Sequence, residues 1–117
     1  MSSQVIFCIT IGLGYVLLGV PLWCRMVPPN ALYGFRTPKT LASPELWYTV
    51  NKFGGKQLTL FGLVFIVIAL VILVFFRDNI VHNSFADIAS HILLLVLVFL
   101  PIIISFIYYF YITRYRK

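Results

Sequence analysis

Charged residues are scarce in this sequence, and acidic residues are the scarcest. The 117 residues include nine Lys or Arg, three Asp or Glu and two His, so charged residues make up only 10% of the chain. Soluble domains carry about 25% charged residues. Hydrophobic residues make up 62% of the chain, which leaves too little polar surface to cover a water-soluble globule. The composition therefore predicts a membrane protein.

Cysteines are also few, and their positions exclude a disulfide framework. Cys8 and Cys24 lie on one predicted helix, separated by roughly 24 Å at about 1.5 Å per residue. A disulfide cannot span that distance, and neither cysteine lies in a Cys-x-x-Cys motif. We expect both to be packing residues.

Motifs for metal binding or catalysis are missing. Asp87 and His91 stand four residues apart, and Asp78 and His82 could join them, but this pair is the only ordered spacing and no His-Glu-x-x-His or Cys set is present. A solvated loop that caps helix ends is favoured over a metal site there. No nucleophile lies near a plausible base. We therefore expect no catalytic residue, no metal and no other cofactor.

Three long runs without charge are the dominant feature of the sequence. They predict helices over about 5–25, 57–76 and 91–112, because a bilayer span needs about 20 apolar residues. In hydrocarbon, a helix satisfies every backbone hydrogen bond internally. We expect an all-α integral membrane protein, one domain over 1–117, with three transmembrane helices.

Between the first two helices lies a polar stretch, the motif segment (residues 26–56). Ser43 and Pro44 predict a helix start, with Ser43 as N-cap. From there apolar and polar residues fall on opposite faces, which predicts a short amphipathic helix at 44–53 lying in the membrane interface. Gly54 and Gly55 are expected to end this helix or to bend it into the second span.

Small residues recur every seven positions in the first two spans. Gly12 and Gly19 share a face of the first helix, and Gly55, Gly62 and Ala69 share a face of the second. Small residues let membrane helices approach closely, so we expect these two faces to meet. A homo-oligomer formed through either face is the alternative.

The basic residues predict the orientation in the membrane. Most lie in or beside the motif segment or in the carboxyl-terminal tail: Arg25, Arg36, Lys39, Lys52, Lys56, Arg114, Arg116 and Lys117. The second connection carries only Arg77. The positive-inside rule places the motif segment and carboxyl terminus in the cytoplasm and the amino terminus outside. Anionic lipid head groups at the inner face are the expected partner of these charges. Nucleic acid is not expected, because no recognition motif is present.

The motif segment resembles the signature of the SdpI family of bacterial membrane proteins. The residues that carry the resemblance are Pro29-Asn30, Tyr33-Gly34-Phe35-Arg36-Thr37-Pro38, Thr40-Leu41, Trp47, Asn51 and Gly55. The family's namesake is an immunity protein against a secreted sporulation-delay toxin, and it is also linked to holding a regulator at the membrane. The resemblance thus implies a bacterial inner-membrane protein. We expect a short member with only the shared domain, without the extra amino-terminal membrane domain of larger members, and the resemblance implies the fold of that shared domain.

Two roles are open for the motif segment. In one, its residues form a site for a ligand or partner such as a lipid head group, a peptide toxin or a cytoplasmic regulator. The candidates are Asn30, Tyr33, Gly34, Arg36, Thr37, Lys39, Trp47 and Asn51. In the other, Arg36 pairs with Glu45 and with loop carbonyls, and Asn51 caps a turn, so that these residues only hold the fold together.

The function that the sequence favours is a non-enzymatic one. We expect immunity to a membrane-active peptide toxin, or sensing of it, through the basic and aromatic motif segment at the inner face. The alternative is a small transporter or lipid-handling protein that works as an oligomer. No ionisable residue of the kind that marks ion or proton paths lies within the three spans.

Overall fold

The chain is all-helical where its structure is described. The computed structural model describes residues 3–75 and 84–115, and these contain four helices and no strand: α1 (Ser3–Trp23), α2 (Pro38–Ala42), α3 (Pro44–Phe75) and α4 (Ser84–Tyr115). Three of them, α1, α3 and α4 from Ile88 onward, are long and apolar enough to cross a membrane. The predicted class, three long helices and a short one in the first connection, is confirmed.

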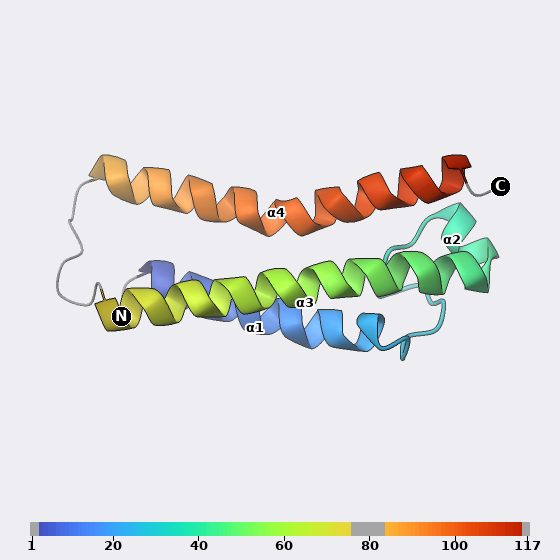
Figure 1. Cartoon of the computed structure of the whole chain (residues 1–117), viewed down its shortest axis with the longest axis horizontal. Coiled ribbons are helices and arrows are strands. Elements are labelled where there is room, and N and C mark those ends of the chain that lie inside the picture. Colours follow the sequence, from blue (N-terminus) through green and yellow to red (C-terminus); the bar gives the residue numbers. More distant parts are fainter. Residues whose placement is uncertain (1–2, 76–83, 116–117) are drawn as a thin grey trace.

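The helices alternate in direction, so the connections fall at opposite ends of the molecule. In Figure 1, α3 runs antiparallel to both α1 and α4. The connection from α1 to α3, helix α2 and the end of α4 lie together at one end, and the amino terminus lies at the other. The motif segment therefore meets all three long helices at a single end of the bundle.

The position of the short helix corrects the sequence-based prediction. Residues 44–53 are not a separate interfacial helix but the first turns of α3, which continues through Gly54 and Gly55. The glycines do not end the helix because Gly55 packs against α1, where an added Cβ would lie 2.6 Å from the Gly19 carbonyl oxygen. The short helix is α2, whose start the prediction missed although Thr37 caps it and Pro38 opens it.

Glycines bring α1 and α3 into close contact. A Cβ added to Gly12 would lie 2.8 Å from the Gly62 carbonyl oxygen, and one added to Gly19 would lie 2.7 Å from the Gly55 carbonyl oxygen. Ala69 is buried farther along the same seam, in a cluster with Val5, Cys8, Phe65 and Leu94. The small-residue faces thus meet within one chain, as expected from their spacing.

The two cysteines have different environments. Cys8 is buried in the seam, as predicted, whereas Cys24 is exposed and both are free thiols. The packing prediction is wrong for Cys24 because that residue lies just past Trp23, where α1 ends.

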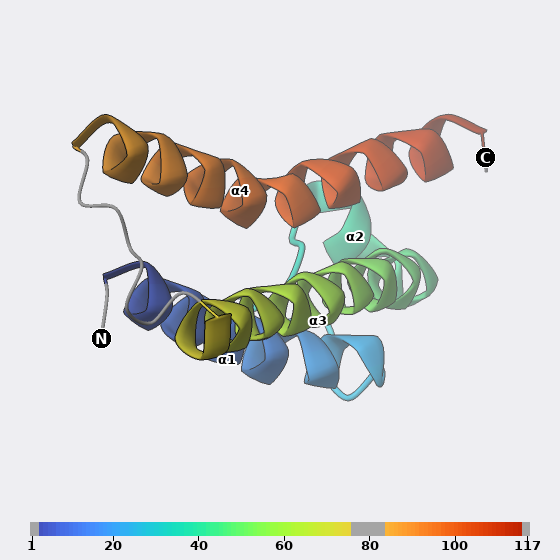
Figure 2. The ribbon, with the colours of Figure 1, turned by 60° about the vertical axis from the view of Figure 1, so that its left-hand side comes forward.

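Helix α4 packs more loosely than the other two. It bends near its middle (Figure 2), in the region of the buried Pro101, which removes one helical hydrogen bond. The Tyr15 hydroxyl on α1 donates to the Val98 carbonyl oxygen. Near the motif segment, the rings of Phe53 and Tyr108 stack with centroids 3.9 Å apart. Helix α4 is thus attached both along the middle of the bundle and near the motif segment.

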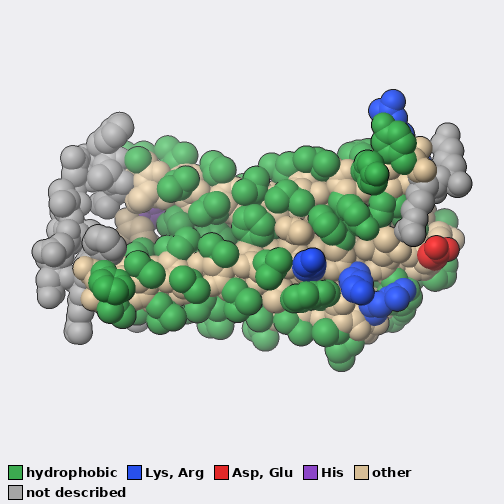
Figure 3. Space-filling view, in the orientation of Figure 1, with side chains coloured by type: hydrophobic (Ala, Val, Ile, Leu, Met, Phe, Trp, Pro, Cys, Tyr) green, Lys and Arg blue, Asp and Glu red, His purple; other side chains and the backbone are tan. Residues whose placement is uncertain are grey.

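The surface separates into an apolar length and a basic end. Hydrophobic side chains cover most of the molecule in Figure 3, and the Lys and Arg side chains in view gather at one end. In α3 the uncharged run from Leu58 to Phe75 spans about 27 Å at 1.5 Å per residue, close to the hydrocarbon thickness of a bilayer. The residues of α3 before Leu58, including Lys52 and Lys56, therefore extend beyond the hydrocarbon.

Candidate functional site

The motif segment begins with a turn that Asn30 organises. The Asn30 Oδ1 accepts hydrogen bonds from the backbone N–H groups of Leu32 and Tyr33, at 2.9 and 2.7 Å. Its Nδ2 donates to the Pro28 carbonyl oxygen at 2.8 Å. An asparagine that bonds to its own neighbours in this way fixes a tight turn. The predicted ligand-binding amide is therefore occupied by the backbone around it.

Tyr33 attaches this turn to the first span. Its hydroxyl donates to the Leu18 carbonyl oxygen of α1, one turn before Pro21, which lies inside the same helix. Burial raises the pKa of the Tyr33 hydroxyl above its usual value. The shift favours the protonated form, which is the form that donates this hydrogen bond.

Gly34 occupies a position that other residues would not tolerate. Its φ is +118°, in the region that favours glycine. An added Cβ would lie 2.9 Å from the Asn51 Oδ1 and 3.0 Å from the Trp47 ring. The close approach brings the loop backbone directly onto α3.

Asn51 is the residue of α3 that holds the loop. It is buried, with 2% of its surface exposed. Its Oδ1 accepts from the Phe35 N–H at 2.5 Å, and its Nδ2 donates to the carbonyl oxygens of Phe35 and Trp47 at 3.3 and 3.0 Å. The amide therefore satisfies both polar groups of one loop residue while keeping a bond within its own helix.

Trp47 and Thr40 complete this attachment. Trp47 is fully buried, and its Nε1–H donates to the Val27 carbonyl oxygen at 2.9 Å. The Thr40 hydroxyl, also buried, donates to the Phe35 carbonyl oxygen at 3.1 Å. Thr37 and Thr40 form a reciprocal capping box at the start of α2. These bonds supply partners for loop backbone groups next to the apolar helices.

The motif segment also contacts α4. The Phe35 ring lies against those of Phe106 and Tyr109, with centroids 4.6 and 5.1 Å apart. The Thr37 hydroxyl donates to the Tyr109 hydroxyl at 3.2 Å. Sequence reasoning missed Phe35 and Tyr109 as part of the site. The signal for them was the aromatic residue inside the motif and the run of aromatics near the end of the chain.

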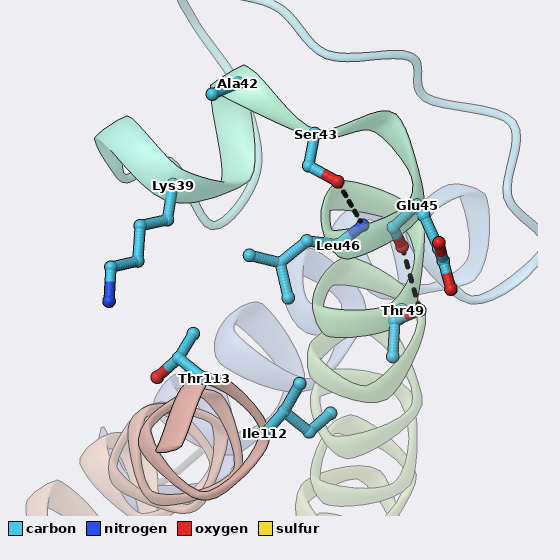
Figure 4. Close-up of a pocket in the computed structure, with 8 residues that line it drawn as sticks. All are labelled: Lys39, Ala42, Ser43, Glu45, Leu46, Thr49, Ile112 and Thr113. Carbon is cyan, nitrogen blue, oxygen red and sulfur yellow. Dashed lines mark hydrogen bonds between the residues drawn. The ribbon is translucent and has the colours of Figure 1, made fainter. Parts of the chain in front are cut away.

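The two basic candidates lie on the outside of this network. Arg36 is exposed, and its guanidinium donates to the Ala31 carbonyl oxygen. Lys39 is exposed on α2 and lines a pocket of about 450 Å³ between α2, the start of α3 and the end of α4. Figure 4 shows Lys39 beside Thr113 in this pocket and Glu45 on its far side, pointing away. The expected pairing of Arg36 with Glu45 is absent among the described residues.

The structure thus divides the predicted site into two sets. The amides of Asn30 and Asn51 and the indole of Trp47 bind loop backbone, and Asn51 and Trp47 are buried. Arg36 and Lys39 face outward. The two sets therefore do not form the single ligand-binding site that the sequence analysis considered for them. The alternative predicted role for Asn51, holding the fold together, agrees with its bonds.

The start of α3 follows the prediction at residue level. The Ser43 Oγ accepts from the Leu46 N–H at 3.3 Å (Figure 4), which confirms Ser43 as the N-cap of the helix that Pro44 begins. The apolar face of this first part buries Trp47 and Val50. Glu45, on the opposite face, is exposed.

An apolar cavity of about 200 Å³ lies beneath the motif segment. It is bounded by α1, α3, α4 and the loop, and its lining is Leu18, Leu22, Tyr33, Gly34, Phe35, Asn51, Gly54, Leu58, Pro101, Ile102 and Ser105. The buried Ser105 hydroxyl donates to the Pro101 carbonyl oxygen in the same helix. Loop residues and membrane-spanning residues therefore share one cavity wall.

The residues weighed for a metal site fall mostly beyond what the structure describes. Asp78 and His82 lie outside the described residues, and so does the side chain of Asp87. The His91 Nε2 lies 3.4 Å from the Ser3 Oγ. Within 3–75 and 84–115, the described side chains include no group of three His, Cys, Asp or Glu that could hold a metal.

Comparison with known proteins gives one match. The model of the SdpI/YfhL protein family matches residues 26–109, which begin with the motif segment and continue through α3 and most of α4. No curated protein and no solved structure shows significant similarity to the chain.

Proposed function

Because this chain belongs to the SdpI/YfhL family, we propose that it confers immunity to a membrane-active peptide toxin, or senses one. It is a multi-pass membrane protein, and in this proposal it acts without catalysing a reaction. The motif segment lies at the inner face of the bacterial plasma membrane, and the amino terminus lies outside. The family's namesake, which protects against a sporulation-delay toxin, is the precedent for this role.

The observation that carries the proposal is the apolar cavity beneath the motif segment. Leu58 begins the uncharged run of α3, and Ile102, 40% exposed, lies within the apolar span of α4, so residues of two membrane spans line the cavity. A peptide within the bilayer can place an apolar side chain there without leaving the lipid. Small-ligand sites are concave, mostly apolar and equipped with a few polar groups, and this cavity has that character.

The cavity connects the membrane spans with the motif segment, because residues of both line it. Gly34 and Phe35 form part of its wall, and the Phe35 peptide is held by Asn51. An occupant therefore contacts the same loop that carries Arg36 on its outer side. A peptide side chain bound in the cavity would change the position of this loop. Such a change could report the presence of the peptide to the cytoplasm.

The orientation is supported by the position of the basic residues. The Lys and Arg residues that the structure describes lie just after α1, in the motif segment or in the last turn of α4, and these parts of the chain share one end of the bundle (Figure 1): Arg25, Arg36, Lys39, Lys52, Lys56 and Arg114. Arg77, Arg116 and Lys117 lie outside the described residues. The positive-inside rule favours the cytoplasm for that end.

The proposal is tested by challenge with the sporulation-delay toxin in cells that carry or lack the gene. Ile102 lines the cavity and the neighbouring Ile103 does not. A tryptophan in place of Ile102 should therefore fill the cavity, whereas one in place of Ile103 should leave it open. Both residues are about equally exposed, at 40% and 51%, so they form a matched pair. We expect wild type and Ile103→Trp to protect, and Ile102→Trp to lose protection at an unchanged membrane level.

Two results would overturn the proposal. Equal killing with and without the wild-type gene contradicts peptide immunity, and altered lipid or solute flux in the same cells would favour the transporter or lipid-handling alternative. Equal protection by Ile102→Trp and Ile103→Trp contradicts the role of the cavity.

A further inference from the structure

A groove separate from the apolar cavity carries a cluster of basic side chains. It lies where the end of α1 meets α3 and α4, and its volume is about 610 Å³. We call it the basic groove, and its lining is Trp23, Arg25, Tyr48, Thr49, Lys52, Phe53, Lys56 and Tyr108. None of these residues is acidic, and three of them, Arg25, Lys52 and Lys56, carry a positive charge.

The positive charge in the groove has no partner on α3. Lys52 and Lys56 stand four residues apart on one helix, an arrangement in which like charges destabilise the helix. Residues three or four positions away from either lysine include no Asp or Glu. Glu45, the one acid whose side chain the structure describes, is not part of the groove. An anion bound between the lysines would relieve their repulsion.

Arg25 adds a third charge from a strained position. The bonds from Met26 N–H to the Pro21 carbonyl oxygen and from Arg25 N–H to the Leu22 carbonyl oxygen, at 2.9 and 3.2 Å, form a Schellman end to α1. Arg25 takes the residue position where glycine is favoured, with φ +59°. Its guanidinium carbon lies 5.3 Å from the centroid of the Tyr48 ring. The arginine side chain is thus held over α3, beside the lysines, at a backbone cost that glycine would avoid.

The groove lies at the depth of lipid head groups. Lys56 stands two residues before Leu58, where the uncharged run of α3 begins, and Trp23 is the last residue of α1. Tyr and Trp residues concentrate at the membrane–water interface, and Tyr108, stacked on Phe53, forms one wall here. Basic pockets between helices on the cytoplasmic side are suited to phosphate-bearing head groups.

We propose that the basic groove binds the phosphate-bearing head group of an anionic phospholipid through Arg25, Lys52 and Lys56. The guanidinium of Arg25 suits paired oxygens of the phosphate, and the two ammonium groups supply further donors. Trp23, Tyr48 and Tyr108 face the region just below the phosphate. The site is distinct from the apolar cavity, so it stands whether or not the protein protects against a peptide.

The test uses the purified full-length protein in detergent, titrated with phosphatidylglycerol or phosphatidylcholine and read by native mass spectrometry. We expect phosphatidylglycerol to be retained in preference to phosphatidylcholine. Lys52→Gln and Lys56→Gln remove one charge each without disfavouring the helix, and each should weaken phosphatidylglycerol binding by roughly tenfold. Lys39→Gln is the matched control, because Lys39 is exposed on the motif segment but outside the groove.

Arg25→Gly separates binding from folding. The substitution relieves the positive φ, so the thermal midpoint should stay the same or rise, while phosphatidylglycerol binding falls with that of the lysine variants. Equal retention of the two lipids would overturn the proposal. The proposal would also be overturned if Lys39→Gln weakened phosphatidylglycerol binding as much as Lys52→Gln does. That result would indicate a general attraction between the basic end of the protein and anionic lipid. Displacement of the lipid by millimolar inorganic phosphate would identify free phosphate, not lipid, as the ligand and would equally contradict it.

Discussion

The side-chain amide of Asn51 brackets the peptide of Phe35, accepting from its N–H at 2.5 Å and donating to its carbonyl oxygen at 3.3 Å. One buried residue of α3 thereby replaces the hydrogen bonds that an extended loop would otherwise seek in water. Because the Phe35 ring contacts Phe106 and Tyr109 of α4, the same loop residue joins α3 to α4, beside the direct stack of Phe53 on Tyr108.

Replacing Asn51 by Leu should detach the loop. The change keeps the size of the side chain but leaves the Phe35 N–H and carbonyl without that partner, at a cost of about 1–3 kcal/mol. Equilibrium unfolding in detergent measures the loss. Thr49→Val is the control, because the exposed Thr49 hydroxyl bonds only to a carbonyl of its own helix. Equal stability of the two variants would contradict the role assigned to Asn51.

A large side chain at Gly55 should separate α1 from α3. An added Cβ would lie 2.5–2.6 Å from the Trp23 nitrogen, the Gly19 carbonyl oxygen and the Leu22 Cβ, and two of these are backbone atoms that cannot move aside. We expect Gly55→Leu to lower the thermal midpoint in detergent sharply. Gly14→Leu is the matched control, since a Cβ there meets nothing within 4 Å. If both variants melted alike, the glycine seam would not hold the two helices together.

Gly34→Ala should destabilise the loop specifically. The residue combines a φ of +118° with an Asn51 oxygen 2.9 Å from the added Cβ. A residue forced into a sparsely populated backbone region costs on the order of 1–3 kcal/mol. The measurement is the unfolding free energy together with protease sensitivity of the motif segment. Gly14→Ala, in an open helical position, should instead gain up to about 1 kcal/mol. Losses of the same size in both would show that the loop geometry does not require glycine.

Arg36→Lys tests whether the exposed guanidinium recognises a partner. The charge is kept, while the planar fork and its bond to the Ala31 carbonyl are lost. Because Arg36 is exposed, we expect folding to change by no more than about 0.5 kcal/mol. Protection in the toxin challenge should nevertheless fall. Equal losses of protection and of folded protein in the membrane would indicate that Arg36 serves only the structure.

Periodicity and small-residue spacing were sufficient to predict the bundle. The uncharged runs predicted three long helices, and the seven-residue spacing of Gly12 and Gly19 with Gly55 and Gly62 predicted faces that meet within the chain. These features are local and repeat at a fixed period, so one sequence carries enough information to find them. The Ser43 cap could be predicted for the same reason.

The end of the bundle could be predicted only in part. Two adjacent glycines, Gly54 and Gly55, are typical of a helix end, so the sequence predicted one there. Helix α3 continues instead, and Gly55 packs against α1 in a tertiary contact that local sequence does not reveal. Asn51 and Trp47 were candidates for ligand binding, with a structural role for Asn51 as the alternative, and their partners are loop backbone groups 16 and 20 residues away in sequence. Arg25 gave no local sign of its positive φ, because glycine is the usual residue there.

The central claim is that the motif segment lies rigidly at the inner face of the membrane. The direct measurement is labelling of a single cysteine at position 39, an exposed site on α2, in a protein whose Cys8 and Cys24 are replaced by Ala and Ser. A membrane-impermeant maleimide should leave Lys39→Cys unmodified in intact cells and modify it after permeabilisation. Rapid labelling in intact cells would place the motif segment outside and contradict the account.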